Sequence, residues 1–201
     1  MTSDVNRQEL KEKYGKKRVP HEWRGTDFLS IAVTTFLGSG MSPKAPGTMG
    51  SLAATIVAYP MAIVAVKLFG DEGFNPFFLI AAIVVFFGAI PFVNKAMKDT
   101  GTEDPGWIVI DEVCGIFMTF AFINPYMITA FPPLLVLGFA LFRFFDILKP
   151  LGIHRFEKFP GAWGVMADDL LGGIYAGLLL FPIYFAFWTG VLTFSIATSN
   201  P

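Results

Sequence analysis

The acidic residues of this chain that could do chemistry stand where long apolar runs begin or end. Six acids share this placement: Asp104, Asp111, Glu112, Asp146, Asp168 and Asp169. Carboxylates at such boundaries are costly unless they are paired or bound to a cation. A hard divalent cation such as Mg²⁺ accepts several carboxylate oxygens and keeps some of its water. The pattern therefore indicates a metal site, with a metal-activated water or a bridged phosphate as its chemistry.

A structural role for the same acids is the alternative interpretation. They could cap helix N-termini, pair with Arg143, Lys149 or Lys158, or meet water at the membrane interface. For any single acid the two interpretations are equally good. The convergence of three separate segments favours the metal site for the set.

Basic and hydroxyl residues near these acids could bind a phosphate. Arg143, Asp146 and Lys149 are spaced i, i+3 and i+6, which predicts a shared helix face. Segment 38–51 is rich in Gly, Pro, Ser and Thr, contains Lys44 and ends where an apolar helix begins. Backbone N–H groups at such a helix start suit an anion. On spacing alone, however, an ordinary turn explains this segment slightly better, and it has no Walker A sequence.

The sequence lacks the residues that other classes of phosphatase require. Phe120, not an arginine, stands six positions after the lone Cys114, so a cysteine phosphatase loop is not supported and Cys114 is expected to be a packed small residue. His21 and His154 are the only histidines, and His21 lies in a polar tail. There is also no Asp-x-Asp sequence for an aspartyl-phosphate site.

The elements that must position these residues are apolar helices. The chain has 201 residues, of which 54% are hydrophobic, more than a soluble core of this size needs. Five stretches are long enough, or nearly so, to cross ~30 Å of hydrocarbon. They are 50–69, 76–93, 107–123, 126–145 and 170–194. With 28–37 as an interfacial or re-entrant helix, we expect an all-α integral membrane protein with about five transmembrane helices.

The distribution of Lys and Arg predicts the orientation of these spans. The polar tail 1–25 holds seven of the 15 basic residues, and five spans place all the others except Lys67 on the same side as the tail. This asymmetry predicts a cytoplasmic N-terminus, an outer C-terminus and all six acids at the cytoplasmic face. Residues 26–201 are expected to form a single membrane domain. The net charge of −1 gives no reason to expect a nucleic-acid partner, and the oligomeric state stays open.

Four ordered segments resemble the signatures of the bacterial phosphatidylglycerophosphatase A family. They are SGMSPKAPGTMGSLAA (39–54), DPGWIVIDEVCG (104–115), RFFDILKP (143–150) and GAWGVMADDLLGG (161–173). Their order and spacing fit, and the resemblance covers the chain from residue 28 to about residue 180. Two positions depart from the pattern: Pro105 stands where some members have histidine, and Ala162 where glycine is common.

The resemblance implies Mg²⁺-dependent hydrolysis of phosphatidylglycerophosphate to phosphatidylglycerol and phosphate, in phospholipid biosynthesis at the cytoplasmic face of a bacterial inner membrane. Our hypothesis is direct attack by a metal-activated water, with a carboxylate nucleophile and a phosphoenzyme as the alternative. The expected catalytic residues are Asp111, Glu112, Asp146, Asp168 and Asp169. All of these except Asp146 are expected metal ligands, and Asp146 is a further ligand or the base. The expected substrate-binding residues are Ser39, Ser42, Lys44, Thr48, Arg143 and Lys149.

Two other functions remain open on the sequence. A cation transporter or channel would also carry acids in the membrane, although these acids gather at one interface rather than along a path. A phosphatase for another lipid phosphate is the second. A CDP-alcohol phosphotransferase is disfavoured because its Asp-Gly-x-x-Ala-Arg sequence is absent.

Overall fold

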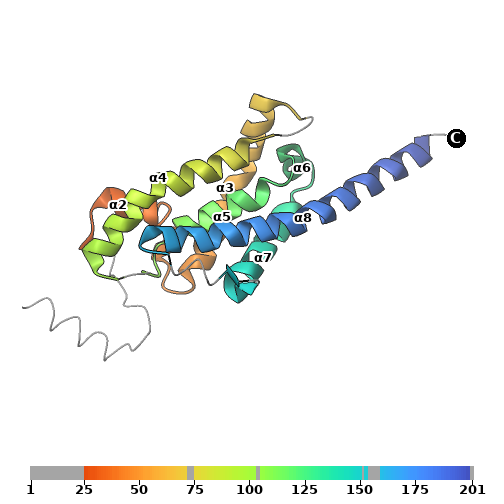
Figure 1. Cartoon of the computed structure of the whole chain (residues 1–201). Coiled ribbons are helices and arrows are strands. Elements are labelled where there is room, and N and C mark those ends of the chain that lie inside the picture. The colour runs from red at the N-terminus through yellow and green to blue at the C-terminus, as the bar shows by residue number, and fades with distance from the viewer. Residues whose placement is uncertain (1–24, 72–74, 103–104, 151, 154–158, 200–201) are drawn as a thin grey trace, which may run out of the picture.

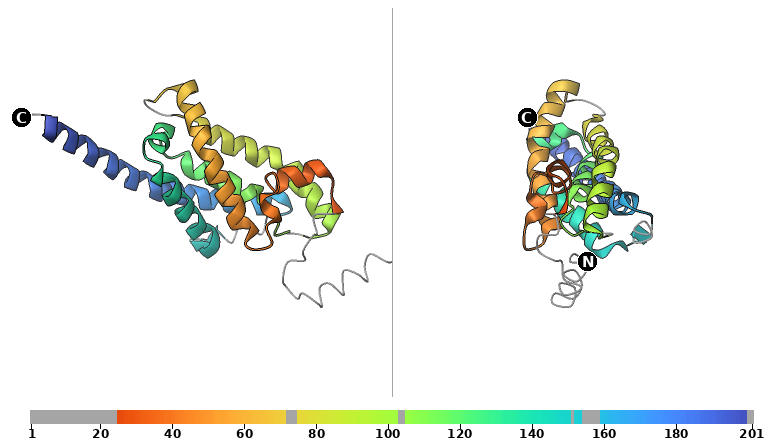
Figure 2. Two further views of the ribbon diagram at one scale, coloured as in Figure 1. Left: turned by 180° about the vertical axis from the view of Figure 1, so that it is seen from behind. Right: turned by 90° about the vertical axis from the view of Figure 1, so that its left-hand side faces the viewer.

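The computed structural model describes residues 25–71, 75–102, 105–150, 152–153 and 159–199, and no strand occurs in these ranges. The helices are drawn in Figures 1 and 2. In chain order they are α2 (Phe28–Thr34), the 3₁₀ helix η2 (Ser39–Met41), α3 (Pro46–Phe69), α4 (Phe77–Thr100), α5 (Ile110–Phe120), α6 (Pro125–Ala130), α7 (Pro133–Leu148) and α8 (Ala162–Ser199). The predicted all-α class is confirmed for the described residues. The polar tail 1–24 lies outside them.

Three helices of the described chain are long and apolar enough to cross a membrane: α3, α4 and residues 162–186 of α8. The 24 residues of α3 extend about 36 Å, which exceeds the hydrocarbon thickness. These three helices correspond to the first, second and fifth predicted spans. The chain is therefore a membrane protein, and the total of about five crossings remains a prediction.

The third and fourth predicted spans are not continuous helices of spanning length. Helix α5 has only 11 residues, or about 16 Å, and all of them except Glu112 are buried. It packs against α3, α4, α7 and α8 and lies between α4 and α8 in Figure 1. The stretch 126–145 is divided because α6 ends at Ala130 and α7 starts at Pro133. Pro132 and Pro133 cannot continue a helix from α6, and Pro132 also keeps Phe131 out of the helical region.

Small residues bring the helix backbones close together. On α3, a row of alanines is fully buried: Ala54, Ala58, Ala62 and Ala65. Between α5 and α8 the approach is closer still, because a methyl group at Gly173 would overlap the carbonyl oxygen of Gly115. Such contacts are typical of helices that pack in a membrane. This approach of α5 to α8 fixes the acids of the two helices relative to each other.

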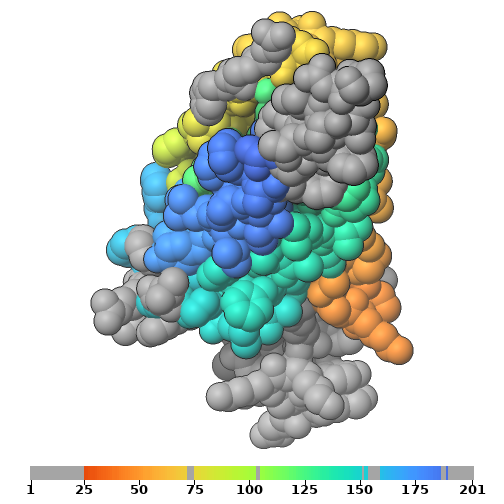
Figure 3. Space-filling model, turned by 90° about the vertical axis from the view of Figure 1, so that its right-hand side faces the viewer, coloured from red at the N-terminus to blue at the C-terminus, as the bar shows by residue number. Residues whose placement is uncertain are grey.

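The far end of α8 extends away from this packing. The helix runs on from residue 186 to Ser199 and projects from the other helices in Figures 1 and 2. Nearer its start, α8 packs along α7, and Figure 3 shows the two side by side in blue and teal. A largely apolar cavity of about 540 Å³ lies at the end of α5 that is remote from its acids, lined among others by Met118, Phe122 and Phe181.

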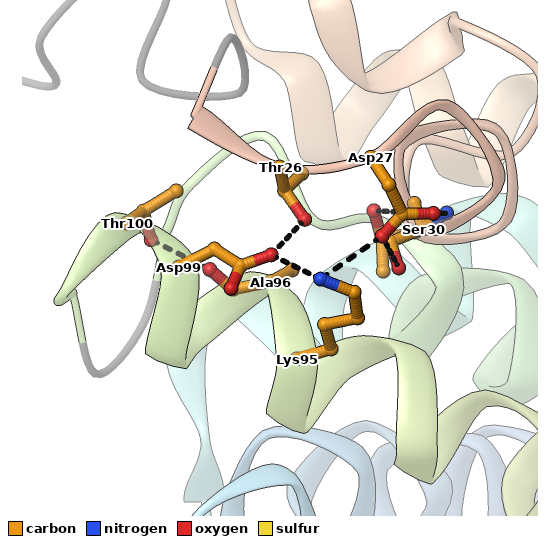
Figure 4. Close-up of polar contacts among 8 residues, drawn as sticks. Thr26, Asp27, Ser30, Lys95, Ala96, Asp99 and Thr100 are labelled. Atoms are coloured by element: carbon orange, nitrogen blue, oxygen red, sulfur yellow. Dashed lines mark hydrogen bonds and ion pairs between the residues drawn. The ribbon is translucent and has the colours of Figure 1, made fainter.

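A polar cluster fixes α2 to the end of α4 (Figure 4). Asp27 caps α2 by accepting the backbone N–H and the hydroxyl of Ser30, at 3.1 and 2.7 Å. Lys95 of α4 lies 3.3 Å from Asp27 and 2.6 Å from Asp99, and Thr26 donates its hydroxyl to Asp99 at 2.7 Å. The hydrogen bonds from Ser30, followed by those from Lys95, lower the pKa of Asp27 to about 2. Asp27 is therefore ionised at neutral pH, and α2 is anchored at its N-terminal end.

Candidate active site

Three carboxylates from two helices converge at one point of the helical bundle. Asp111 and Glu112 lie in the first turn of α5, as the sequence predicted for the start of an apolar segment. Asp169 comes from α8. One carboxylate oxygen from each of the three lies within 4.8 Å of the others. This arrangement allows a single cation to contact all three.

The two acids of α8 lie deeper than the sequence predicted. We expected Asp168 and Asp169 to begin the fifth span, roughly 170–194. Helix α8 begins earlier, at Ala162, so both acids lie within the helix and are only 6% and 4% exposed. The start of α8 is capped from α4, because the side-chain oxygen of Asn94 accepts the N–H of Ala162 at 2.9 Å. Gly161 precedes it with a φ of 62°, a conformation that favours glycine.

The three carboxylates fit a hard divalent cation. Oε2 of Glu112 is buried and has no hydrogen-bond partner among the described residues. Asp169 also has the charges of Asp146, Asp111 and Asp168 as its neighbours. An ionised carboxylate only accepts hydrogen bonds, so several of them buried together require protons or a cation. The group contains no histidine or cysteine, and oxygen-only ligands suit Mg²⁺ or Mn²⁺ rather than Zn²⁺.

Two cationic side chains flank this carboxylate group, each held by an acid. Arg143 of α7 forms an ion pair with Asp146, and its Nη1 donates to Oγ of Ser51 at 3.3 Å. Nζ of Lys149 lies 2.5 Å from Oδ2 of Asp168. Of the four predicted metal ligands, three form the group and Asp168 lies against Lys149 instead.

Lys149 does not continue the helix face that its spacing predicted. Helix α7 ends at Leu148, and Lys149 follows in the left-handed conformation with a φ of 44°. The i, i+3 relation of Arg143 and Asp146 holds, but Lys149 reaches Asp168 from beyond the helix end. A non-glycine residue in this conformation is strained, and such strain is often found at functional sites.

The Gly/Pro-rich segment leads directly to the carboxylate group. Helix α3 begins at Pro46 without a side-chain cap, after Ala45 in the left-handed conformation. A methyl group at Gly47 would overlap Oε1 of Glu112 and lie 3.5 Å from Nη1 of Arg143. The start of α3 is therefore part of the site. Gly47 and Ser51 were not among the predicted binding residues, although both lie in the segment that the sequence singled out.

The predicted hydroxyl residues of this segment have local partners. Ser39 donates its hydroxyl to the carbonyl oxygen of Thr35 at 2.9 Å, and Ser42 donates to that of Lys44 at 2.8 Å. The Lys44 side chain is exposed, and Thr48 is half-buried in the first turn of α3. Asp104, the sixth acid of the prediction, lies outside the described residues.

Fold and site together define a helical membrane protein with a buried carboxylate site suited to a divalent cation. The family model described as phosphatidylglycerophosphatase A matches residues 32–184. The chain belongs to the phosphatidylglycerophosphatase A family, and this membership identifies it as an enzyme, a phosphatidylglycerophosphatase.

Curated relatives cover most of their own length in these matches. The phosphatidylglycerophosphatase A of Haemophilus influenzae is 39% identical over 153 residues, 74% of this chain and 84% of the relative. That of Escherichia coli is 34% identical over 148 residues, 72% of this chain and 77% of the relative. A protein of Bacteroides thetaiotaomicron with the provisional name phosphatidylinositol-3-phosphatase is 38% identical over 162 residues, 76% of this chain and 92% of the relative. No solved structure shows a significant match.

Proposed function

We propose that this enzyme hydrolyses the terminal phosphomonoester of phosphatidylglycerophosphate in an Mg²⁺-dependent reaction, as a step of phospholipid biosynthesis. The family supports the substrate, and the site supports the metal. The observation that carries the metal dependence is the convergence of Asp111, Glu112 and Asp169, with a buried Glu112 oxygen that has no hydrogen-bond partner among the described residues.

Asp111, Glu112 and Asp169 are the residues that would hold Mg²⁺. When bound, the ion supplies Lewis-acid chemistry, which polarises the phosphoryl group and makes water a better nucleophile. Asp168 was predicted as a fourth ligand. In the proposal it orients Lys149 instead, because the two side chains are 2.5 Å apart.

The cationic groups of the chain bind and orient the phosphate. Arg143 is held by Asp146 and Ser51, so its remaining N–H groups are positioned for phosphate oxygens. Lys149 contributes a second positive charge, and the uncapped start of α3 at Gly47 and Thr48 offers backbone donors. Ser39, Ser42 and Lys44 complete the proposed phosphate-binding segment, at its more exposed side.

Asp146 is the proposed general base. It lies beside Asp169 and accepts from Arg143. In the proposed step a water oxygen bonds to phosphorus, the bond between phosphorus and the glycerol oxygen breaks, and the water proton passes by way of Asp146 to the leaving alcohol. The lipid tails stay in the bilayer while the headgroup meets the site at the membrane surface.

We further propose that this surface is the cytoplasmic face of a bacterial inner membrane. The excess of Lys and Arg in the tail and in the segments on the same side supports this orientation. The basic tail 1–25 would then lie close to anionic lipid headgroups.

A panel of lipid phosphates tests the substrate. Purified protein is incubated with phosphatidylglycerophosphate, phosphatidic acid and phosphatidylinositol 3-phosphate in mixed micelles, with Mg²⁺ or with EDTA, and Asp111→Asn serves as the control. We expect Mg²⁺-dependent phosphate release with a preference for phosphatidylglycerophosphate and none from the variant. Preferential release from phosphatidylinositol 3-phosphate would support the second candidate function, which the name of the Bacteroides thetaiotaomicron relative suggests.

A further inference from the structure

Thr35 directly follows α2, is fully buried, and forms hydrogen bonds through both its hydroxyl and its carbonyl oxygen. Its hydroxyl donates to the carbonyl oxygen of Ile31 at 2.6 Å and accepts the N–H of Gly38 at 2.9 Å. Its carbonyl oxygen accepts the Ser39 hydroxyl and the N–H of Gly40, both at 2.9 Å. One residue thus binds three members of the turn that follows it.

This turn needs such support because it is left-handed. Phe36, Leu37 and Gly38 have φ angles of 45°, 56° and 98°. Residues other than glycine are strained in this region, and two in succession persist only when their surroundings hold them. Phe36 is half-buried and Leu37 is exposed, so little packing holds Leu37 in place. The hydrogen bonds of Thr35 therefore support the turn at Gly38, Ser39 and Gly40, while the N–H groups of Phe36 and Leu37 bind the carbonyl oxygens of Val33 and Ala32.

The turn and α2 together hold the residue from which α5 starts. The carbonyl oxygen of Thr34 accepts the N–H of Val109 at 2.8 Å, and Val109 immediately precedes α5. A methyl group at Gly40 would overlap the carbonyl oxygen of Trp107 and lie 3.1 Å from both methyl carbons of Val109. The next residues of the chain are Ile110 and then the site acids Asp111 and Glu112. A shift of this turn would therefore move the two acids.

We infer that Thr35 is a positioning residue: through the turn 36–40 and Val109 it sets the place of Asp111 and Glu112 at the cation site. Its hydroxyl is bonded to Ile31 and Gly38 rather than to either acid, and it lies before the first signature segment. The inference rests on the proposed function for its catalytic consequence. Its consequence for cation binding stands on the geometry alone.

The neighbouring residue supplies a matched control. Thr34 is also fully buried, and its hydroxyl donates to the carbonyl oxygen of Ser30 at 2.6 Å, as that of Thr35 donates to Ile31. The difference is that the Thr35 hydroxyl also accepts the N–H of Gly38. Thr34→Val and Thr35→Val therefore change the side chain in the same way and lose the same kind of helical hydrogen bond. Only Thr35→Val also removes the acceptor of the Gly38 N–H, while the bonds to the Thr35 carbonyl oxygen remain.

The test measures Mn²⁺ binding by electron paramagnetic resonance in detergent, without lipid, and the kcat and KM of phosphate release from phosphatidylglycerophosphate. For Thr35→Val we expect weaker Mn²⁺ binding and a kcat lowered about tenfold to a hundredfold, the range that follows from a small displacement of catalytic groups. KM for the lipid should stay near the parental value. Thr35→Ser, which keeps the hydroxyl, should restore both quantities, and Thr34→Val should match the parent.

Folded Thr35→Val protein with parental Mn²⁺ affinity would overturn the inference, as would an equal loss in Thr34→Val. If Thr35→Val does not fold, Gly40→Ala replaces it, because the added methyl group presses on Trp107 while the bonds of Thr35 remain. Parental Mn²⁺ affinity in Gly40→Ala would again overturn the inference. If the parent binds Mn²⁺ but releases no phosphate, the proposed function fails, while weaker Mn²⁺ binding in Thr35→Val still supports the positioning role.

Discussion

Gly47 lies against the carboxylate of Glu112, so that the first turn of α3 and the first turn of α5 meet without space for a methyl group. Arg143 of α7 approaches the same glycine. Three helices thus bring together the start of α3, Glu112 of α5 and Arg143 of α7, which are the proposed anion-binding helix start, cation ligand and phosphate-binding side chain.

Gly47→Ala should reduce activity without reducing stability. The methyl group would displace the Glu112 carboxylate, and we expect kcat to fall about tenfold to a hundredfold. Alanine is also the better helix former, so the thermal unfolding temperature in detergent should not fall. Gly88→Ala in α4 is the matched control because nothing lies within 4 Å of the position of its methyl group. Equal activity of the two variants would contradict the proposed contact.

Arg143→Lys should not preserve activity although it preserves the charge. The single ammonium nitrogen of a lysine does not reproduce the planar fork with which Arg143 reaches Asp146, Ser51 and, in the proposal, a phosphate oxygen. Hydrogen bonds to charged groups contribute about 1.5–3 kcal/mol, so we expect kcat/KM to fall about tenfold to a hundredfold. Ser51→Ala removes only the 3.3 Å contact and should have a smaller effect. A fully active Arg143→Lys enzyme would show that Arg143 acts only as a charge.

Variants of the Lys149–Asp168 pair distinguish a role of Lys149 in stability from a role in substrate binding. Lys149→Ala removes the ammonium group that lies 2.5 Å from Asp168, whose side chain is 7% exposed. Removal of one partner from a fully buried pair costs about 3–5 kcal/mol of stability, and we expect a smaller loss here because the Lys149 side chain is 26% exposed. The double variant Lys149→Ala/Asp168→Asn should recover part of this loss in thermal unfolding. It should not recover phosphate release, because the proposed phosphate contact of Lys149 is still absent, and recovered activity would assign Lys149 a structural role alone.

The anchor of α2 at Asp27 should be independent of pH under assay conditions. The hydrogen bonds from Ser30, followed by those from Lys95, lower the pKa of Asp27 from 3.8 to about 2. A carboxyl group whose pKa is lowered by folding stabilises the folded state above its unfolded pKa, and this contribution is lost as the pH falls through about 2. Amide hydrogen exchange of α2, corrected for its intrinsic pH dependence, should therefore show the same protection at pH 5 as at pH 8. A loss of protection between these values would mean that another group controls α2.

Much of the membrane architecture was predictable from hydropathy. The spans that correspond to α3 and α4 were predicted correctly because these helices are apolar over a full crossing length, including exposed side chains such as Ile56 and Val84. Helix α5 is equally apolar but is enclosed by protein, and hydropathy does not distinguish enclosure by protein from enclosure by lipid. The division between α6 and α7 was missed by the prediction of one span over 126–145, although Pro132-Pro133 marks it in the sequence.

The sequence predicted that acids from separate segments gather at one place, but not which of them faces the others and which faces a basic residue. Asp111, Glu112 and Asp169 converge as expected, whereas Asp168 faces Lys149, because neighbours on a helix point about 100° apart. Which of two adjacent acids faces the group depends on where α8 begins and how it packs on α5. Gly47 was missed because glycine carries no functional group, and its role is the space that it leaves for Glu112.

The Mg²⁺ dependence of phosphate release by the parent and by Glu112→Gln tests the central claim most directly. Glutamine keeps the shape of Glu112 but loses the charge that the cation requires. We predict that phosphate release from phosphatidylglycerophosphate by the parent saturates with Mg²⁺ and stops in EDTA, and that Glu112→Gln loses about a hundredfold or more, the scale of removing one electrostatic contact at a reacting centre. Parental activity of Glu112→Gln, or phosphate release by the parent in EDTA, would contradict the account.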